Sequence, residues 1–259
     1  ADGLHQMRIT ARRLRSCLAA CRPLLDERTA RRLESELRWL GQELSEIRDL
    51  EVMRERLLAA VAAEPASATT RRMATVVRSS LRKAERLAQR RSQAALNSDR
   101  HARLRAALEA LLDEPPFTPR ARKKAVKVLD HRLTRSWRRL TTRVAAADES
   151  SGSAHDEALH AVRKASKRLR YAAELTEPTL GKPADRLRKR AQAMQKALGD
   201  HQDSIVARAW YERLGREATS TAAAFGFGRL HAREQSAAGT YVAAYGEAVD
   251  KVRTVSRLR

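Results

Sequence analysis

The chain has 259 residues and carries 53 Lys and Arg against 31 Asp and Glu, which gives a formal net charge of +22 at pH 7. Because 42% of its residues are hydrophobic, it can bury a core, and this excludes a disordered basic tail. Only 10 glycines and 7 prolines interrupt it, a composition that favours helices over sandwiches, barrels and glycine-rich nucleotide folds. No apolar run is long enough to span a membrane, and residues 1–10 do not resemble a signal peptide. We therefore expect a cytoplasmic, all-α protein.

Helical segments with one apolar face are predicted between clusters of turn-forming residues. The clusters fall at 64–67, 113–116, 148–153, 177–183 and 225–228. In three of the segments, apolar residues recur at steps of three and four, which predicts a core face on each helix. These residues are Leu4, Met7, Ala11, Leu14 and Leu18 in 4–22, Leu33, Leu37, Leu40, Leu44 and Ile47 in 31–61, and Val126, Leu129, Leu133, Trp137, Leu140 and Val144 in 119–146.

An internal repeat divides the chain into two halves. Residues 4–15 match 159–170 without gaps in the pattern L-H-x-[MV]-R-x-x-x-[RK]-R-L-R, and 44–49 match 198–203 in the same order. The period is too long for a solenoid and indicates duplicated helical bundles instead. We expect a first bundle over 1–147, a polar linker over 148–157 and a second bundle over 158–259, as two pseudo-symmetric units that face each other.

Three helix faces carry rows of basic residues beside the predicted core faces, and each row contains one histidine. On an ideal helix the members of the first row share an arc about 80° wide. The three rows, called the basic stripes below, are His5, Arg8, Arg12 and Arg15; the repeat copy His160, Arg163, Lys167 and Arg170; and Lys124, Lys127, His131, Arg135 and Arg138. Arg13, Lys164 and Arg168 fall outside these arcs, so we interpret them as ordinary solvated charges.

The composition of the basic stripes predicts a bound anion. Solvated helix faces normally mix charges of both signs at i,i+4, whereas these faces hold almost no carboxylates and so carry like-charge repulsion. Arg outnumbers Lys by 43 to 10, and the forked guanidinium suits bidentate contacts to phosphate oxygens. A basic face that is merely solvated remains the alternative for any single stripe.

The residues that accompany the stripes indicate which anion. Proteins that read duplex DNA use Asn or Gln as well as Arg, yet Asn97 is the single asparagine of the chain. Single-strand binders supply aromatic platforms, but Trp39, Trp137 and Phe117 lie on or near predicted core faces. A flexible polymer that presents phosphates and no bases fits better, and inorganic polyphosphate is such a polymer.

The paired motifs resemble those of a known family. His160, Arg163, Lys167 and Arg170, followed by 194–200 and Asp203, together with 5–15 and 48–52 in the first half, resemble the CHAD family, the conserved histidine α-helical domain. The resemblance implies antiparallel helical bundles around a central basic groove that binds polyphosphate. It also implies a fused or separate partner domain of the CYTH type, which handles triphosphates, and an association with polyphosphate granules. The candidate polyphosphate-binding residues are His5, Arg8, Arg12, Arg15, Lys124, Lys127, His131, Arg135, Arg138, His160, Arg163, Lys167, Arg170 and His201.

Other functions fit parts of the pattern. Asp2 and Glu157 precede His5 and His160 by three residues, a spacing used in di-iron bundles, but the cations that follow each histidine disfavour a metal ion. No nucleotide-binding or hydrolase motif is present, so we predict no catalytic residue, metal site or cofactor. Sequence-independent nucleic-acid binding and histidine-dependent hydrolysis of polyphosphate or phosphate esters remain as alternatives.

Overall fold

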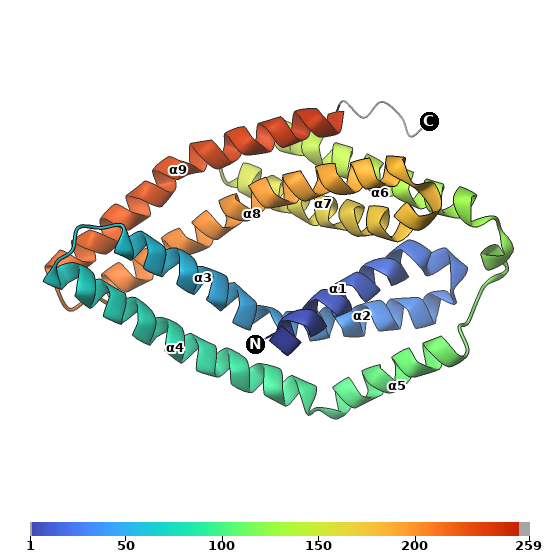
Figure 1. Ribbon diagram of the computed structural model, residues 1–259, viewed down its shortest axis with the longest axis horizontal. Helices are drawn as coiled ribbons and strands as arrows, with labels where there is room; N and C mark the ends of the chain where they lie inside the picture. Colours follow the sequence, from blue (N-terminus) through green and yellow to red (C-terminus); the bar gives the residue numbers. More distant parts are fainter. Residues whose placement is uncertain (1, 254–259) are drawn as a thin grey trace. The chain divides into compact units, whose positions relative to one another are not determined.

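The chain folds almost entirely into α-helices. The computed structural model describes residues 2–253, and the side chains of all of these except Asp2, Ser153 and Ala238. This part of the chain contains nine α-helices and two short 3-10 helices (Figure 1), which confirms the predicted all-α class. None of these helices is long and apolar enough to cross a membrane. The elements are α1 (Asp2–Cys21), η1 (Arg22–Leu24), α2 (Glu27–Glu43), α3 (Ser45–Ala62), α4 (Ala68–Leu96), α5 (Asp99–Asp113), η2 (Pro119–Arg122), α6 (Ala125–Asp148), α7 (Gly152–Leu180), α8 (Lys182–Arg216) and α9 (Thr221–Arg253).

Four of the five predicted turn clusters lie at helix ends. α4 begins after Ser67, whose hydroxyl oxygen accepts a hydrogen bond of 3.0 Å from the Thr70 amide and so satisfies a donor of the first turn. α7 ends before Gly181, whose φ of 62° lies in the left-handed region that favours glycine. The turn predicted at 225–228 is wrong, because these residues lie inside α9.

The residues form two compact units that interleave along the chain. Unit 1 comprises Ala1–Arg8, Leu40–His101 and Asp200–Tyr241, and unit 2 comprises Ile9–Trp39, Ala102–Gly199 and Val242–Arg259. This division differs from the predicted bundles 1–147 and 158–259, because the long helices α8 and α9 each contribute residues to both units. The predicted linker 148–157 also differs, since α7 already begins at Gly152. Ala1 and residues 254–259 of the predicted bundles lie outside the described residues.

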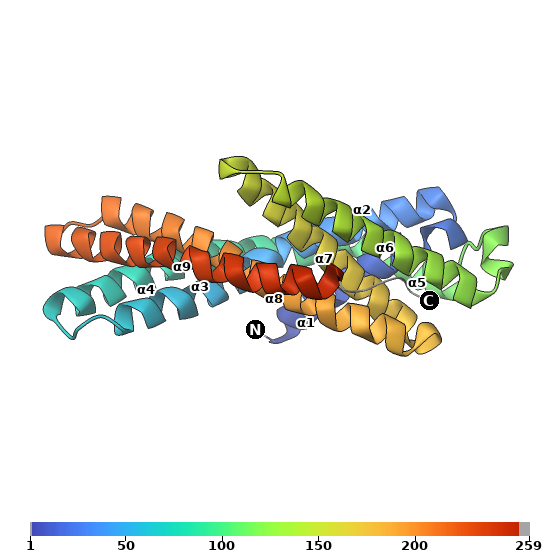
Figure 2. The ribbon, with the colours of Figure 1, turned by 90° about the horizontal axis from the view of Figure 1, so that it is seen from above.

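The core of unit 1 is formed by α3, α4 and the parts of α8 and α9 that belong to it. α3 packs along α4, and Figures 1 and 2 show the two helices side by side. The largest fully buried side chains here include Tyr211 and Phe227, which lie among Leu57, Met73 and Leu81. Most of these core residues come from α4, α8 and α9, which the predicted core faces did not cover.

Gly226 explains why glycine stands inside α9. A Cβ at this position would lie 2.5 Å from Sδ and 2.9 Å from Cε of Met73, whose side chain is only 2% exposed. The missing side chain therefore allows α9 to approach α4 closely. Gly228 in the same helix has no atom within 4 Å of an added Cβ.

This contrast predicts opposite effects of two alanine substitutions. Gly228→Ala is expected to stabilise unit 1 by up to about 1 kcal/mol through helix propensity alone. Gly226→Ala gains the same propensity but overpacks Met73, which costs about 1–3 kcal/mol, so it should be less stable than Gly228→Ala by about that amount. Urea denaturation of the two variants measures the difference, and equal free energies of unfolding would contradict the packing role of Gly226.

The core of unit 2 is centred on α6 and α7, which pack along each other (Figure 2). The core face predicted in 31–61 is confirmed in α2, where Leu33 and Leu37 are buried, and the one in 119–146 is confirmed for Leu133, Leu140 and Val144. Some predicted core residues lie at the surface instead. Val126, which is 54% exposed in the first turn of α6, and Leu14, which is 39% exposed on α1, are examples.

Candidate anion-binding site

Most of the predicted anion-binding residues belong to unit 2. Of the first basic stripe, Arg12 and Arg15 are in unit 2, while His5 and Arg8 are in unit 1 with His201. Unit 2 also holds the two other stripes, which are His160, Arg163, Lys167 and Arg170 on α7, and Lys124, Lys127, His131, Arg135 and Arg138 at and after the start of α6. The geometry of unit 2 is therefore where a site can be described.

Five arginines from four helices of unit 2 lie close enough for their charges to act on one another. Burial lowers the pKa of Arg15 on α1, and the charges of Arg38 on α2 and Arg12 lower it further. The pKa of Arg168 on α7 is lowered by burial and then by Arg139 on α6, Arg15 and Arg38. These five residues, Arg12, Arg15, Arg38, Arg139 and Arg168, are called the arginine cluster below.

Glu34, whose charge acts on Arg15 and Arg168, is already paired with another arginine. Glu34 is 7% exposed and accepts two hydrogen bonds from Arg22, of 2.9 Å from Nε and 2.5 Å from a terminal nitrogen. Such a bidentate pair satisfies both carboxylate oxygens, so Glu34 offsets the charge of the cluster only at a distance. Within residues 2–253, no member of the arginine cluster forms an ion pair.

Three members of the arginine cluster are not among the predicted anion-binding residues. Arg168 is exposed, in agreement with its prediction as a solvated charge, but the charges of Arg139, Arg15 and Arg38 also act on it because the helix faces of a bundle converge. A residue that lies off the stripe of its own helix can still face the basic residues of its neighbours. Arg38 and Arg139 were in no stripe, and no spacing within α2 or α6 identifies them.

The α7 stripe has buried guanidinium nitrogens with unused donors. The Nε atoms of Arg163 and Arg170 are buried and have no hydrogen-bond partner among the described residues. The Arg170 guanidinium lies 4.5 Å from the centroid of the Tyr171 ring, a distance typical of a cation–π contact. Because a buried unpaired donor is unfavourable, these two side chains are suited to an acceptor from a ligand.

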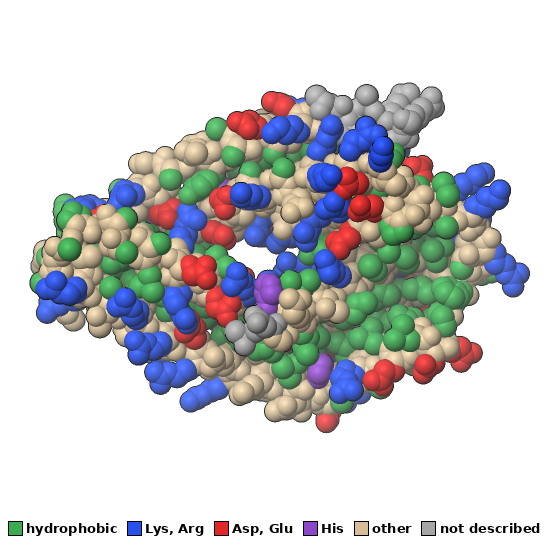
Figure 3. All heavy atoms as spheres, viewed as in Figure 1, with side chains coloured by type: hydrophobic (Ala, Val, Ile, Leu, Met, Phe, Trp, Pro, Cys, Tyr) green, Lys and Arg blue, Asp and Glu red, His purple; other side chains and the backbone are tan. Residues whose placement is uncertain are grey.

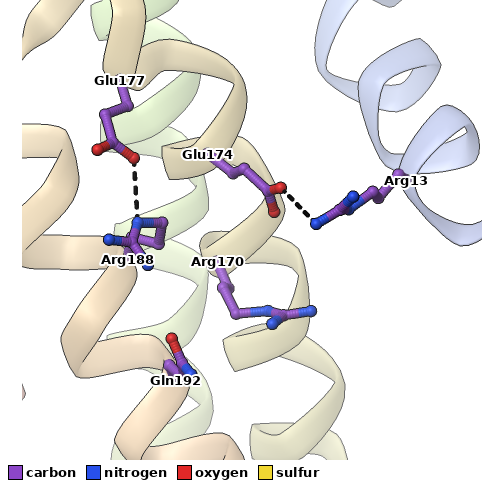
Figure 4. Close-up of a pocket in the computed structure, with 6 residues that line it drawn as sticks. All are labelled: Arg13, Arg170, Glu174, Glu177, Arg188 and Gln192. Atoms are coloured by element: carbon purple, nitrogen blue, oxygen red, sulfur yellow. Dashed lines mark hydrogen bonds and ion pairs between the residues drawn. The ribbon is translucent and has the colours of Figure 1, made fainter. Parts of the chain in front are cut away.

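A small polar pocket lies beside this stripe. It has a volume of about 290 Å³ and is lined by Arg13, Arg170, Glu174, Glu177, Arg188 and Gln192, from α1, α7 and α8 (Figure 4). Arg13 pairs with Glu174 at 2.9 Å, and Arg188 pairs with Glu177 at 3.0 Å and also with Asp185. Arg13 is 57% exposed, in agreement with its prediction as a solvated charge, but it also has a carboxylate partner on the facing helix α7.

The α6 stripe is more open to solvent. Lys124, Lys127, His131, Arg135 and Arg138 are all exposed, and none of them forms an ion pair with a described residue. Beside them, half-buried Arg132 has its pKa lowered by burial and by Arg135. On the face of the molecule shown in Figure 3, acidic side chains lie among the basic ones, so the scarcity of carboxylates is a local property of the stripes.

The histidines that begin the stripes differ in their surroundings. His5 is half-buried with an Nδ1 atom that lacks a hydrogen-bond partner, His160 is exposed, and His201 is buried. The part of the chain that the structure describes contains no group of three His, Cys, Asp or Glu residues that could hold a metal ion. His160 is thus not part of such a group, while the side chain of Asp2, which precedes His5 by three residues, lies outside the described residues.

Comparison with known proteins decides the family. The family model described as the CHAD domain matches residues 1–212. The chain belongs to the CHAD family. Solved structures agree, because a CHAD domain from the plant Ricinus communis superposes with a TM-score of 0.71 at 25% identity and covers 99% of this chain and 83% of its own. PptA from Streptomyces chartreusis shares the fold, with a TM-score of 0.82 at 23% identity, covering 96% of this chain and 89% of its own.

Two curated relatives of this CHAD domain are longer proteins. They are the uncharacterized proteins MT2285 and Rv2226 from two strains of Mycobacterium tuberculosis, each 32% identical over 237 residues. The match covers 90% of this chain but only 44% of either relative, so the chain spans less than half of their length.

Proposed function

We propose that this CHAD domain binds inorganic polyphosphate and does not hydrolyse it. The observation that carries the proposal is the arginine cluster, in which the charges of neighbouring guanidiniums lower the pKa of Arg15 and Arg168 and no member forms an ion pair within residues 2–253. A polyanion relieves this repulsion, and guanidiniums bind phosphate oxygens in bidentate pairs. The exposed α6 stripe extends the basic surface along which a chain of phosphates can bind.

The surroundings of the cluster favour a ligand without bases. Tyr171, the aromatic residue next to Arg15 and Arg170, is 6% exposed, so its ring has no open face on which a base could stack. Glu34 is held by Arg22 and is not disposed to coordinate Mg²⁺, which metal-assisted hydrolysis of polyphosphate would require. On the family resemblance alone, we also propose a CYTH-type partner domain and association with polyphosphate granules in the cytoplasm.

Calorimetry with polyphosphates of defined length tests the proposal. Affinity should rise from tripolyphosphate to longer chains and then level off, because a longer chain can contact more of the basic residues at once. It should also fall steeply with salt, since each phosphate contact releases a counterion. An affinity that is independent of chain length and salt would contradict the proposal.

Two further assays separate the alternatives. Single-stranded or duplex nucleic acid at equal phosphate concentration should fail to displace long-chain polyphosphate; efficient displacement would favour nucleic-acid binding. Incubation with polyphosphate and Mg²⁺ or Mn²⁺ should release no phosphate. Release that depends on His5, His160 or His201 would show that the protein is an enzyme.

A further inference from the structure

The polar pocket of unit 2 differs from the arginine cluster in its charge. Two of its three arginines are already neutralised, because Arg13 pairs with Glu174 and Arg188 pairs with Glu177 and Asp185. Arg170 alone has no ion pair with a described residue. Figure 4 shows its guanidinium beside Glu174, on the side of α7 that also meets Arg13. The pocket therefore offers one unmatched cation rather than a row of them.

The pocket also offers hydrogen-bond acceptors, which a purely anionic ligand cannot use. In its ion pair, each of Glu174 and Glu177 uses one carboxylate oxygen, and the other oxygen can accept a further hydrogen bond. The Nε of Arg170 is buried and lacks an acceptor. A ligand that satisfies both kinds of group must carry a negative charge together with a hydrogen-bond donor, and in a phosphate group this donor is a P–OH.

We propose that this pocket binds a phosphate group that carries a proton, either as free phosphate or as the last phosphate of a polyphosphate chain. The second source rests on the proposed function. Oxygens of the group accept hydrogen bonds from Arg170, while its P–OH donates to Glu174 or Glu177. The volume of about 290 Å³ leaves room for one phosphate group and several waters.

The proton on the phosphate group distinguishes the ends of a polyphosphate chain from its interior. A terminal phosphate, like a phosphomonoester, has a second ionisation with a pKa of about 6, so near neutral pH it exchanges readily between one and two negative charges. An internal phosphate of the chain is bonded to two neighbours and has no such proton to donate. Glu174 and Glu177 would accept no hydrogen bond from an internal phosphate, so the pocket selects chain ends against interiors.

Linear and cyclic phosphates test the proposal. Linear tripolyphosphate has two chain ends, whereas cyclic tetrametaphosphate has a comparable charge and none. Arg170→Ala should lower the affinity for tripolyphosphate about tenfold or more, as expected for the loss of a charge-assisted hydrogen bond. Its affinity for tetrametaphosphate should change much less, so the ratio of the two affinities falls. Calorimetry at constant salt gives both values.

Matched variants control for net charge and folding. Arg186→Ala removes an exposed arginine of α8 that does not line the pocket, and it should keep the wild-type ratio. Glu174→Gln preserves the size of the side chain but weakens the acceptor, so it should lower the preference for tripolyphosphate while binding tetrametaphosphate at least as well as the wild type. If orthophosphate competes with tripolyphosphate and the competition depends on Arg170, free phosphate is a ligand of the pocket. If orthophosphate does not compete, the pocket binds the ends of polyphosphate chains.

The results of these experiments distinguish the pocket proposal from the proposed function. If long-chain polyphosphate binds but Arg170→Ala and Glu174→Gln both keep the wild-type ratio, the pocket proposal is overturned and the proposed function stands. If long chains do not bind but tripolyphosphate or orthophosphate binds in an Arg170-dependent manner, the proposed function falls and the pocket proposal stands.

Discussion

Replacing Arg15, Arg38 and Arg168 together by Ala is expected to weaken the binding of long-chain polyphosphate by at least about a hundredfold. Each guanidinium–phosphate contact is a charge-assisted hydrogen bond, which contributes about 1.5–3 kcal/mol. Because the three side chains repel one another in the ligand-free protein, the variant should be at least as stable as the wild type. Calorimetry and thermal unfolding measure the two quantities, and the salt dependence of binding should become shallower.

A matched triple variant separates the arginine cluster from net charge. Arg31, Arg103 and Arg105 are exposed, and Arg31 and Arg105 already pair with Glu27 and Glu109 on their own helices. Replacing these three by Ala removes the same charge from unit 2 and should reduce affinity only a few-fold, through the general field of the protein. Equal losses in the two triple variants would show that binding follows net charge and needs no cluster.

The helical fold of the chain is predictable because its signals are local. Steps of three and four between Leu33, Leu37 and Leu40 mark a helix face, and all three residues are buried. The repeat of 4–15 in 159–170 correctly places a helix in each half, and the helices α2 and α8 that follow also begin at equivalent positions of the repeat. The periodicity does not show how much of each apolar face other helices cover. Leu14, for example, belongs to the predicted apolar face of α1 but lies at the surface.

The arginine cluster is not predictable from spacing, because its members come from four helices. The stripe on α1 identifies Arg12 and Arg15, but Arg38, Arg139 and Arg168 join them only through the packing of α2, α6 and α7. The two interleaved units were missed for a related reason, since hydrophobic spacing along α8 and α9 does not indicate that one helix contributes to two cores. The turn predicted at 225–228 is wrong for a similar reason, because Gly226 lies against Met73 of another helix, a contact distant in sequence.

A second large effect is expected in unit 1, where a partly buried ion pair connects α3 to α9. Arg56 donates hydrogen bonds of 2.8 Å to both carboxylate oxygens of Glu234 and one of 2.7 Å to the Tyr241 hydroxyl. The side chains of Arg56 and Glu234 are only 22% and 13% exposed. Arg56→Met leaves the Glu234 carboxylate without its partner and should lower the free energy of unfolding at pH 7 by about 3 kcal/mol.

Two matched variants identify the unpaired carboxylate as the cause. Arg91→Ala removes an arginine of unit 1 that pairs with Glu46, and because these two side chains are 57% and 43% exposed, the loss should be about 1 kcal/mol or less. The double variant Arg56→Met, Glu234→Met should recover most of the loss, because two apolar side chains leave no charge without a partner. Denaturant unfolding compares all four proteins, and a double variant as unstable as Arg56→Met would contradict this explanation.

The pH dependence supplies an independent readout of the same pair. Burial by itself raises the pKa of Glu234, but the hydrogen bonds and charge of Arg56 outweigh it and hold the pKa below its ordinary value. In the wild type, this carboxylate therefore stabilises the fold above the unfolded pKa of about 4.3, and the contribution is lost as the pH falls through the lower folded value. In Arg56→Met, only Ser204 and the charge of Arg208 still oppose the burial, so the pKa of Glu234 rises and protonation removes the unfavourable charge. The difference in the free energy of unfolding between the two proteins should consequently be largest near pH 7 and become smaller as the pH falls towards 4. A difference that stays constant over this range would show that Arg56→Met acts through lost packing.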